Sequence, residues 1–454
     1  MEMVLEFLRD VLSQPALLIG IMSCIGLIAL KRPFHKVMTG TLKPILGYLM
    51  LAAGAGVIVN NLDPLGKMIE HGFHITGVVP NNEAIVAVAQ KVLGVETMSI
   101  LVVGLLMNLC IARFTKFKYV FLTGHHSLFM ACLMSAVLGT AGLSGMELIL
   151  VGGFLMGAWS AISPAIGQSY TSKVTEGDEI AIGHFGSLGY YLSAWVAKYV
   201  GKADDSTEDI EIPEKWGFLR DSTLSTALTM IVFYLIAAFA AGSEFVATLS
   251  GDMSPYLYAV MSAMNFAVGV TIVYSGVRMI LGDLIPAFQG IATKIIPNAI
   301  PAVDCAVFFT YAPTAVVLGF ISSFIGGIIG MLILGAVGGV LIIPGLVPHF
   351  FCGATAGIYG NATGGRRGAA VGAFLNGLAI TFLPALALPV LGQLGFQNTT
   401  FGDADFAVMG LVLGHAFEWI GMAGIYGIVA IAALVLIIPN FIKTKGKVIN
   451  YVEE

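Results

Sequence analysis

Residues 300–320 have the sequence IPAVDCAVFFTYAPTAVVLGF, and this stretch decides how the chain can fold. It opens an apolar run that continues to residue 343 and contains a single charged side chain, that of Asp304. A helix crosses the hydrocarbon core of a bilayer with about 20 apolar residues, so the run is long enough for two crossings. Pro301 favours a break in the helix shortly before Asp304, and such breaks mark candidate sites in membrane proteins.

The rest of the chain has the same character. Of its 454 residues, 57% are hydrophobic and 11% are charged, with a mean hydropathy of +0.91. Continuous apolar runs exclude a transmembrane β-barrel, which is built from short alternating segments. We therefore predict an all-α polytopic membrane protein with roughly ten to twelve transmembrane helices. The other apolar runs are residues 12–30, 44–60, 97–112, 119–140, 146–163, 223–242, 254–277, 369–392 and 407–441.

The distribution of Lys and Arg predicts the orientation, because short basic loops stay on the cytoplasmic side. The N-terminal segment is net acidic and residues 398–406 carry acids without Lys or Arg, so we expect both outside. No basic segment precedes the first apolar run, which we expect to remain as a membrane helix rather than to be cleaved. An outside start and a cytoplasmic end require an odd number of crossings, and we predict eleven. The basic clusters are Lys31, Arg32, Lys36 and Lys43; Arg113, Lys116 and Lys118; and Lys443, Lys445 and Lys447.

The largest polar interruption, residues 171–222, divides the chain into two halves, 1–222 and 223–454. The segments that begin at Gly40 and Gly290 resemble each other weakly. An odd number of crossings in each half would invert the second copy, as in many secondary transporters. We expect two inverted repeats with re-entrant or broken helices, a terminal helix after the second, and scaffold and core parts interleaved between the halves.

Polar side chains inside apolar runs mark candidate sites, because a charge at the bilayer centre costs about 2.5–3.5 kcal/mol on insertion scales. Asp304 is the first candidate, and its alternative role is to cap a helix. His125 and His126 follow Gly124 at the start of an apolar segment. We expect His125 to contact a ligand and His126 to face a neighbouring helix or the headgroups. His184 can donate and accept hydrogen bonds, which suits a hydroxylated solute, and its alternative is a buried structural histidine.

Other polar groups are more ambiguous. Glu83 is either an acid at a helix start or an acid of a pocket. His415 and Glu418 share one helical face, where they form either a structural pair or a proton relay. The five cysteines have neither metal-ligand nor redox spacing. No phosphate loop, zinc-protease motif or dinucleotide turn appears, and no basic patch, so we expect no self-contained catalytic site, metal, cofactor or nucleic-acid partner.

Five stretches carry a family resemblance: TLKPILGYLMLAAGAGVI (41–58), LTGHHSLFMACL (122–133), IGHFGSLGYYLSAWVAKYVGK (182–202), AVDCAVFFTYAPTAVVLGF (302–320) and LIIPGLVPHFF (341–351). They resemble the membrane subunit, component IIC, of the ascorbate type of the bacterial phosphoenolpyruvate-dependent phosphotransferase system. The resemblance implies an eleven-span homodimer in the bacterial inner membrane, whose core moves the solute inward in an elevator-like displacement. A soluble IIB protein, phosphorylated on cysteine and working with a IIA protein, would then phosphorylate the solute.

The resemblance also implies which residues contact the solute. His125 and Asp304 match positions that bind the sugar in the ascorbate transporters, and His184 matches the histidine of a Gly-His pair. This chain would supply no phosphoryl group itself, so its contribution to the reaction would be to position the solute.

The chain departs from the family pattern at several of these positions. Phe129 and Phe185 stand where the family has glutamines, four residues after the first histidine and directly after the second. Asn82 and Glu83 replace a Thr-Tyr pair, and Ala55 replaces a serine between glycines. The two rings favour a ligand with an apolar face, so the solute is either ascorbate in a rearranged pocket or another sugar acid, sugar alcohol or pentose-like compound.

The sequence therefore predicts a IIC subunit that carries L-ascorbate or a related sugar acid or polyol. The alternative is a stand-alone secondary transporter on the same fold, coupled to protons through Glu418, His415 or Glu83. In both cases the polar side chains must converge on one chamber within the membrane.

Overall fold

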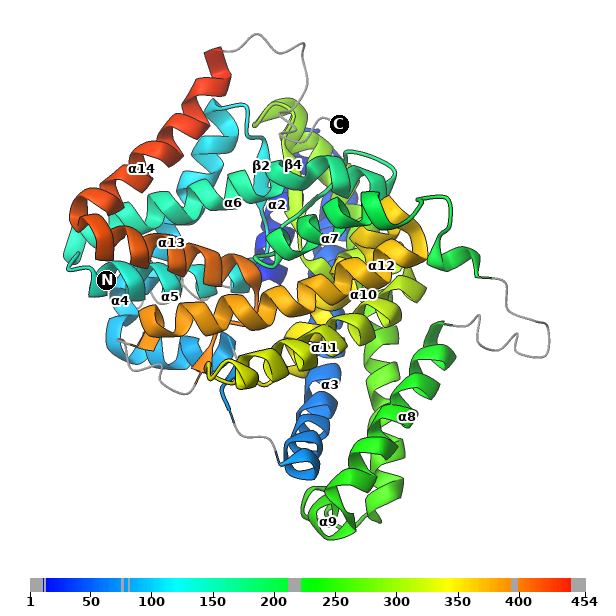
Figure 1. Ribbon diagram of the computed structural model, residues 1–454. Helices are drawn as coiled ribbons and strands as arrows, with labels where there is room; N and C mark the ends of the chain where they lie inside the picture. The colour runs from blue at the N-terminus through cyan, green and yellow to red at the C-terminus, as the bar shows by residue number, and fades with distance from the viewer. Residues whose placement is uncertain are drawn as a thin grey trace.

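The structure is a computed structural model that describes residues 11, 14–74, 77–80, 82–210, 222–392 and 399–441, and helices dominate it (Figure 1). The α-helices are α2 (Pro15–Ala29), α3 (Phe34–Phe73), α4 (Asn82–Phe114), α5 (Gly124–Thr140), α6 (Gly145–Thr175), α7 (Ser187–Val200), α8 (Ser222–Ala241), α9 (Ser243–Ser250), α10 (Pro255–Lys294), α11 (Pro313–Ala336), α12 (Leu346–Gly392), α13 (Ala404–Ile420) and α14 (Met422–Ile437). The 3-10 helices are η1 (Thr207–Asp209), η3 (Cys305–Thr310) and η4 (Ile438–Phe441). The strands are β1 (Val79–Pro80), β2 (Tyr119–Phe121), β3 (Ala181–Ile182), β4 (Ile300–Val303) and β5 (Thr399–Thr400).

Several helices are suited to a lipid environment. Within the described residues, seven are long and apolar enough to cross a membrane, or eight if α8 and α9, which meet at a bend of 117°, form one span. Large apolar side chains such as Leu332 and Ile431 are each 62% exposed on these helices. Exposed apolar surface of this extent fits contact with lipid tails rather than with water. The predicted all-α polytopic architecture is confirmed at this level.

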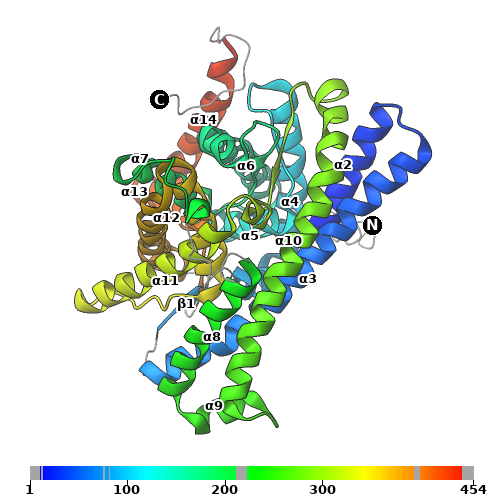
Figure 2. The same ribbon diagram turned by 90° about the vertical axis from the view of Figure 1, so that its right-hand side faces the viewer.

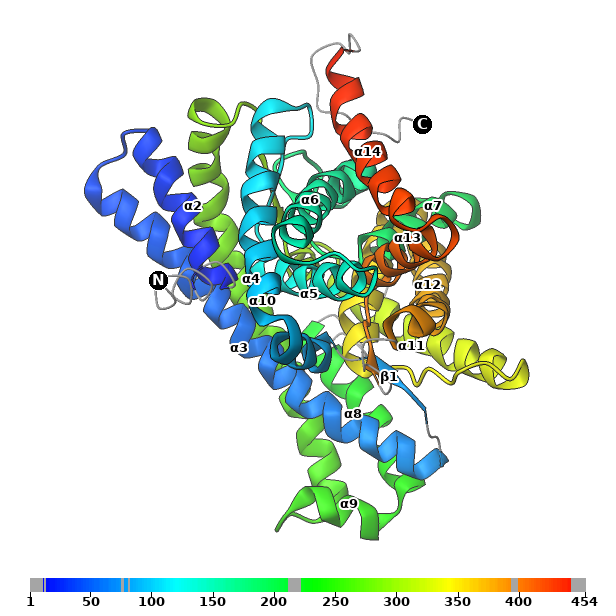
Figure 3. The same ribbon diagram turned by 90° about the vertical axis from the view of Figure 1, so that its left-hand side faces the viewer.

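The helices α3 and α10 are each 40 residues long and lie side by side (Figures 2 and 3). Glycines allow the two backbones to approach closely. A Cβ added at Gly47 would lie 2.8 Å from the carbonyl oxygen of Gly276, and one added at Gly54 would lie 2.7 Å from that of Gly269. The pair forms a straight support along one side of the remaining helices.

The described part of the polar interruption, residues 171–210 and 222, contains regular structure. It contains the end of α6, strand β3 and the whole of α7. After α7 the chain is tied to α12 at Gly365, whose φ of 60° interrupts that helix. Nη2 of Arg366 lies 2.9 Å from Oδ1 of Asp205, and the carboxylate of Glu208 accepts from the first backbone N–H groups of α11.

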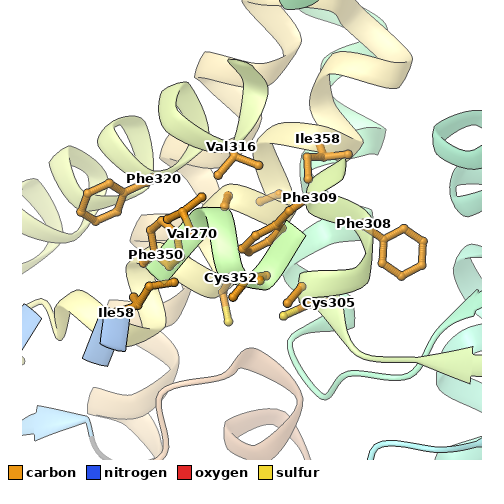
Figure 4. Packing of buried hydrophobic residues seen from close by; sticks show 14 of the residues in the cluster. Ile58, Val270, Cys305, Phe308, Phe309, Val316, Phe320, Phe350, Cys352 and Ile358 are labelled. Carbon is orange, nitrogen blue, oxygen red and sulfur yellow. The ribbon is translucent and has the colours of Figure 1, made fainter. Parts of the chain in front are cut away.

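An apolar cluster supports the centre of the molecule (Figure 4). The ring of Phe350 makes edge-to-face contacts with those of Phe309 and Phe320, at centroid distances of 5.7 and 5.5 Å. The sulfur atoms of Cys305 and Cys352 lie at one edge of this cluster. Because Cys305 directly follows Asp304, the packing holds the backbone on which the predicted site is built.

Candidate functional site

The ends of three parallel strands bring the predicted site residues together. β4 lies between β2 and β3, and both pairings are parallel. His125, His184 and Asp304 follow β2, β3 and β4 within four residues. Because the carboxyl ends of parallel strands share one edge of a sheet, the three side chains converge. Gly183 is needed before His184, since a Cβ there would overlap the carbonyl oxygen of Ala302.

A second set of strand ends lines the same cavity. β1 pairs in parallel with β5, and Val78 forms a parallel bridge with Ile342. Asn82 follows β1, Asp403 follows β5, and Gly345 follows the bridged Ile342. All three residues after these strand ends line the cavity, so it is enclosed by breaks from both halves of the chain.

The cavity has a volume of about 1310 Å³. Small-molecule sites usually have volumes of about 300–1,000 Å³, so this cavity has room for a solute and a path leading to it. Near the C-terminal end of α3, charged side chains of Asp63, Lys67 and Glu70 line it. Five residues predicted to contact the solute line its wall: Asn82, His125, Phe129, His184 and Asp304.

His125 links the sheet to α3. Its Nε2 lies 3.4 Å from Oδ2 of Asp304, and its Nδ1 lies 3.3 Å from the hydroxyl of Tyr48. Oδ1 of Asp304 accepts from the backbone N–H of Ala306 across 3.1 Å, so the aspartate also caps η3. The capping interpretation of Asp304 is therefore confirmed, and because its second oxygen faces His125 the site interpretation stays compatible with it as a prediction.

Hydrogen bonds to Nδ1 fix the tautomer of His184. Its Nδ1 accepts from the backbone N–H of Gly186 across 3.1 Å, and the hydroxyl of Tyr190 lies 2.8 Å from the same nitrogen. A backbone N–H can only donate, so Nδ1 carries a lone pair and the ring proton is on Nε2. His184 therefore carries its N–H donor on Nε2, and it lines the same cavity as the carboxylate of Asp304.

His126 is 4% exposed and lines the cavity, and its ring stacks on Phe406 of the neighbouring helix α13 at a centroid distance of 5.7 Å, so it faces both the cavity and, as expected, a neighbouring helix. Its ring centroid lies 3.8 Å from that of His184. The backbone N–H of Phe185 points to its Nδ1 across 3.4 Å. Both histidines lie in the first turn of α5, and both line the cavity.

Asp403 is the residue that the sequence analysis missed. It is 4% exposed and lines the cavity. Nδ2 of Asn82 donates to its Oδ2 across 2.6 Å, and the thiol of Cys352 donates to its Oδ1 across 2.8 Å. The acids at residues 398–406 were used as a sign of an outer loop. A signal for Asp403 was present in the sequence: Gly402-Asp403 is a glycine followed by a polar residue shortly before a helix, as Gly183-His184 is.

The two phenylalanines lie in different places. Phe129 lines the cavity, as predicted. Phe185 is fully buried behind the wall, where its ring stacks on Phe121 at a centroid distance of 4.6 Å, and it does not line the cavity. The side chains of Glu83 in α4 and Ala55 in α3 are outside the described part of the structure.

His415 and Glu418 are not part of this cavity. Nδ1 of His415 lies 3.0 Å from Oε2 of Glu418, and the two side chains are 41% and 68% exposed. The ring of His415 stacks on Trp419, which is 77% exposed. The pair therefore has the geometry of a surface contact on α13.

Two groups of side chains offer metal-ligand atoms within 4.8 Å of one another: His184, Asp304 and Cys305, and His184, Cys352 and Asp403. In the second group, Oδ1 of Asp403 lies 2.8 Å from Sγ of Cys352 and 3.9 Å from Nδ1 of His184. In addition, Asp403 already accepts from Asn82 and Cys352. The expectation that the site holds no metal stays a prediction.

Apolar helices around a cavity lined by polar helix breaks define an integral membrane permease. The model of a family described as "PTS system sugar-specific permease component" matches residues 10–405, and the chain belongs to that family. A protein of Mycoplasma pneumoniae described as "Ascorbate-specific PTS system EIIC component" is 28% identical over 417 residues. The match covers 78% of this chain and 62% of that relative, so the chain spans less than two thirds of the relative's length.

Proposed function

We propose that this chain is the IIC subunit of a phosphotransferase system and carries L-ascorbate or a related sugar acid or polyol inward. The observation that carries the proposal is the convergence of His125, His184 and Asp304 on one cavity among apolar helices. A hydroxylated solute needs donors and acceptors at fixed positions. Nε2–H of His184 is the donor, and the carboxylates of Asp304 and Asp403 are acceptors.

An inverted repeat is supported by the spacing of the elements. α10 begins and ends 221 residues after α3, at 255 against 34 and at 294 against 73. The strand that follows α10 begins at 300 and the one that follows α3 at 79, which is the same displacement. β4, in the second half, pairs with β2 and β3 from the first half. β1, in the first half, pairs with β5 from the second half, and the adjacent Val78 bridges to Ile342 of the second half. We therefore assign the halves as 1–222 and 223–454, related by a displacement of 221 rather than the 250 suggested by the sequence echo.

We further propose eleven crossings, with shorter apolar helices such as α2 completing the set. With the N-terminus outside and the C-terminus cytoplasmic, α3 runs outward, and the cavity beside Asp63, Lys67 and Glu70 leads to the outer surface. The strand ends and their helices would form the moving core, and α3 with α10 the scaffold. A homodimer joined through the scaffold would keep it fixed while the core is displaced in an elevator-like motion.

The proposed partners are a soluble IIB protein, phosphorylated on cysteine, and a IIA protein. The chain holds the solute and IIB supplies the phosphoryl group, so catalysis by this chain consists of positioning. A carrier that coupled protons through His415 and Glu418 would need this pair to line the cavity. The pair of His415 and Glu418 lies on an exposed face instead.

The test is uptake into proteoliposomes that contain the purified chain. We expect phosphorylated solute to accumulate only when phosphorylated IIB is present on the side of the C-terminus. Uptake of unmodified solute driven by a pH gradient, with no phosphoprotein present, would contradict the proposal and support the proton-coupled alternative.

A further inference from the structure

Neutral groups hold the carboxylate of Asp403 in the cavity wall. Its two oxygens accept from the amide of Asn82, across 2.6 Å, and from the thiol of Cys352, across 2.8 Å. Neither partner carries a positive charge. These hydrogen bonds therefore fix the position of the carboxylate and leave its charge uncompensated.

The nearest imidazole does not supply the missing charge. Nδ1 of His184 lies 3.9 Å from Oδ1 of Asp403, which is within the distance of an ion pair. However, this nitrogen accepts the backbone N–H of Gly186, so it carries no proton and the ring is neutral. His126 is neutral for the same reason, because its Nδ1 accepts from the backbone N–H of Phe185.

The other charges on the wall do not balance Asp403 either. His125 lies beside Asp304 at 3.4 Å, so a proton on His125 would offset the charge of Asp304. Nζ of Lys67 lies 2.7 Å from Oδ2 of Asp63. Glu70 adds another acid. Among the described side chains that line the cavity, carboxylates therefore outnumber fixed cations.

We propose that Asp403 makes the site selective for an uncharged polyhydroxy solute, such as a sugar alcohol, over the sugar acid with the same carbon skeleton. The inference rests on the proposed function, since it takes this cavity as the solute site. Each hydroxyl of a polyol both donates and accepts, so adjacent hydroxyls match the acceptor of Asp403 and the donor of His184. An anionic solute would instead lie beside a like charge in a medium of low dielectric constant.

The experiment compares matched pairs of solutes. The full chain in lipid nanodiscs is titrated calorimetrically with sorbitol and gluconate, and with xylitol and xylonate, whose members differ only in the oxidation of one terminal carbon. We expect the alcohol to bind at least about tenfold more tightly than the acid, a ratio that one uncompensated charge can produce. Asp403→Asn keeps the shape and removes the charge, so it should reduce this preference about tenfold.

Asp252→Asn is the matched control. Asp252 is exposed in the turn between α9 and α10, away from the cavity wall, so the control should keep the wild-type ratio. Tighter binding of the acid by the wild-type protein, or an unchanged preference in Asp403→Asn, would overturn the inference and leave the proposed function intact. Failure of the folded wild-type protein to bind any of these solutes or ascorbate would instead count against the proposed function. If Asp403→Asn does not fold, the wild-type ratio decides the matter.

Discussion

Nε2 of His125 lies 3.4 Å from Oδ2 of Asp304, which joins the end of β2 to the end of β4. The two residues lie in different halves of the chain and meet only because their strands are parallel neighbours. The contact ties the N-terminal turn of α5 to the start of η3, and both face the cavity. A change at either residue should therefore affect solute binding more than stability.

We expect Asp304→Asn to abolish or severely reduce uptake without loss of the folded protein. The variant keeps an oxygen that can cap η3 at Ala306, so the backbone should be preserved. It loses a charged acceptor, and a hydrogen bond to a charged group contributes about 1.5–3 kcal/mol, which corresponds to about 10- to 150-fold in affinity. Calorimetry on the purified protein measures this, with size-exclusion chromatography as the control for folding. Normal affinity would remove Asp304 from the site.

We expect His184→Ala to weaken solute binding by about tenfold or more, because it removes a fixed donor. Tyr190→Phe should have a smaller effect. It deletes the hydroxyl that lies 2.8 Å from Nδ1, but the N–H of Gly186 still orients the ring. Calorimetric titration of both variants tests this order. Equal losses would mean that His184 acts through its buried contacts and not on the solute.

Phe129→Gln and Phe185→Gln should have opposite consequences, although the sequence analysis grouped the two positions. Phe129 lines the cavity, so an amide there adds hydrogen-bonding groups and should raise the affinity for ascorbate. Phe185 is fully buried against Phe121, so its replacement leaves a cavity and an unpaired amide, at a cost of about 3–5 kcal/mol of stability. Thermal unfolding and calorimetry with ascorbate separate the two effects. Improved ascorbate binding by Phe185→Gln would place that ring in the site after all.

Much of the site could be predicted because an ionisable group is costly in a membrane and needs a function or a partner. That argument found Asp304, His125 and His184 without any knowledge of their neighbours. It missed Asp403, because Asp403 stands in a polar segment where acids are ordinary. The cost of its burial becomes visible only when Asn82 and Cys352, distant in sequence, are seen to donate to it.

The apolar helices could be predicted from the sequence, but the way in which the breaks between them pair with one another could not. Hydropathy marks segments that can cross the bilayer, but strands of two to four residues such as β3 and β4 carry no periodic signal. The pairing of these strands determines which breaks between helices lie next to one another in the fold. The proposed repeat was also hard to align from the sequence, since glycine- and alanine-rich apolar segments match at several displacements, whereas the equal lengths of α3 and α10 support a displacement of 221 residues.

The contact between α3 and α10 gives a prediction about stability. A Cβ at Gly276 would lie 2.5 Å from the carbonyl oxygen of Gly47, so Gly276→Val should force the two helices apart and lower the thermal stability. Overpacking of this kind typically costs about 1–3 kcal/mol. Gly282→Val is the control, because Gly282 lies in the same helix and a Cβ there meets nothing within 4 Å. We expect thermal unfolding in detergent to show a clear decrease for the first variant and little change for the second. Equal melting temperatures for both variants would mean that the two long helices do not pack through their glycines, and the scaffold assigned to them would lose its main support.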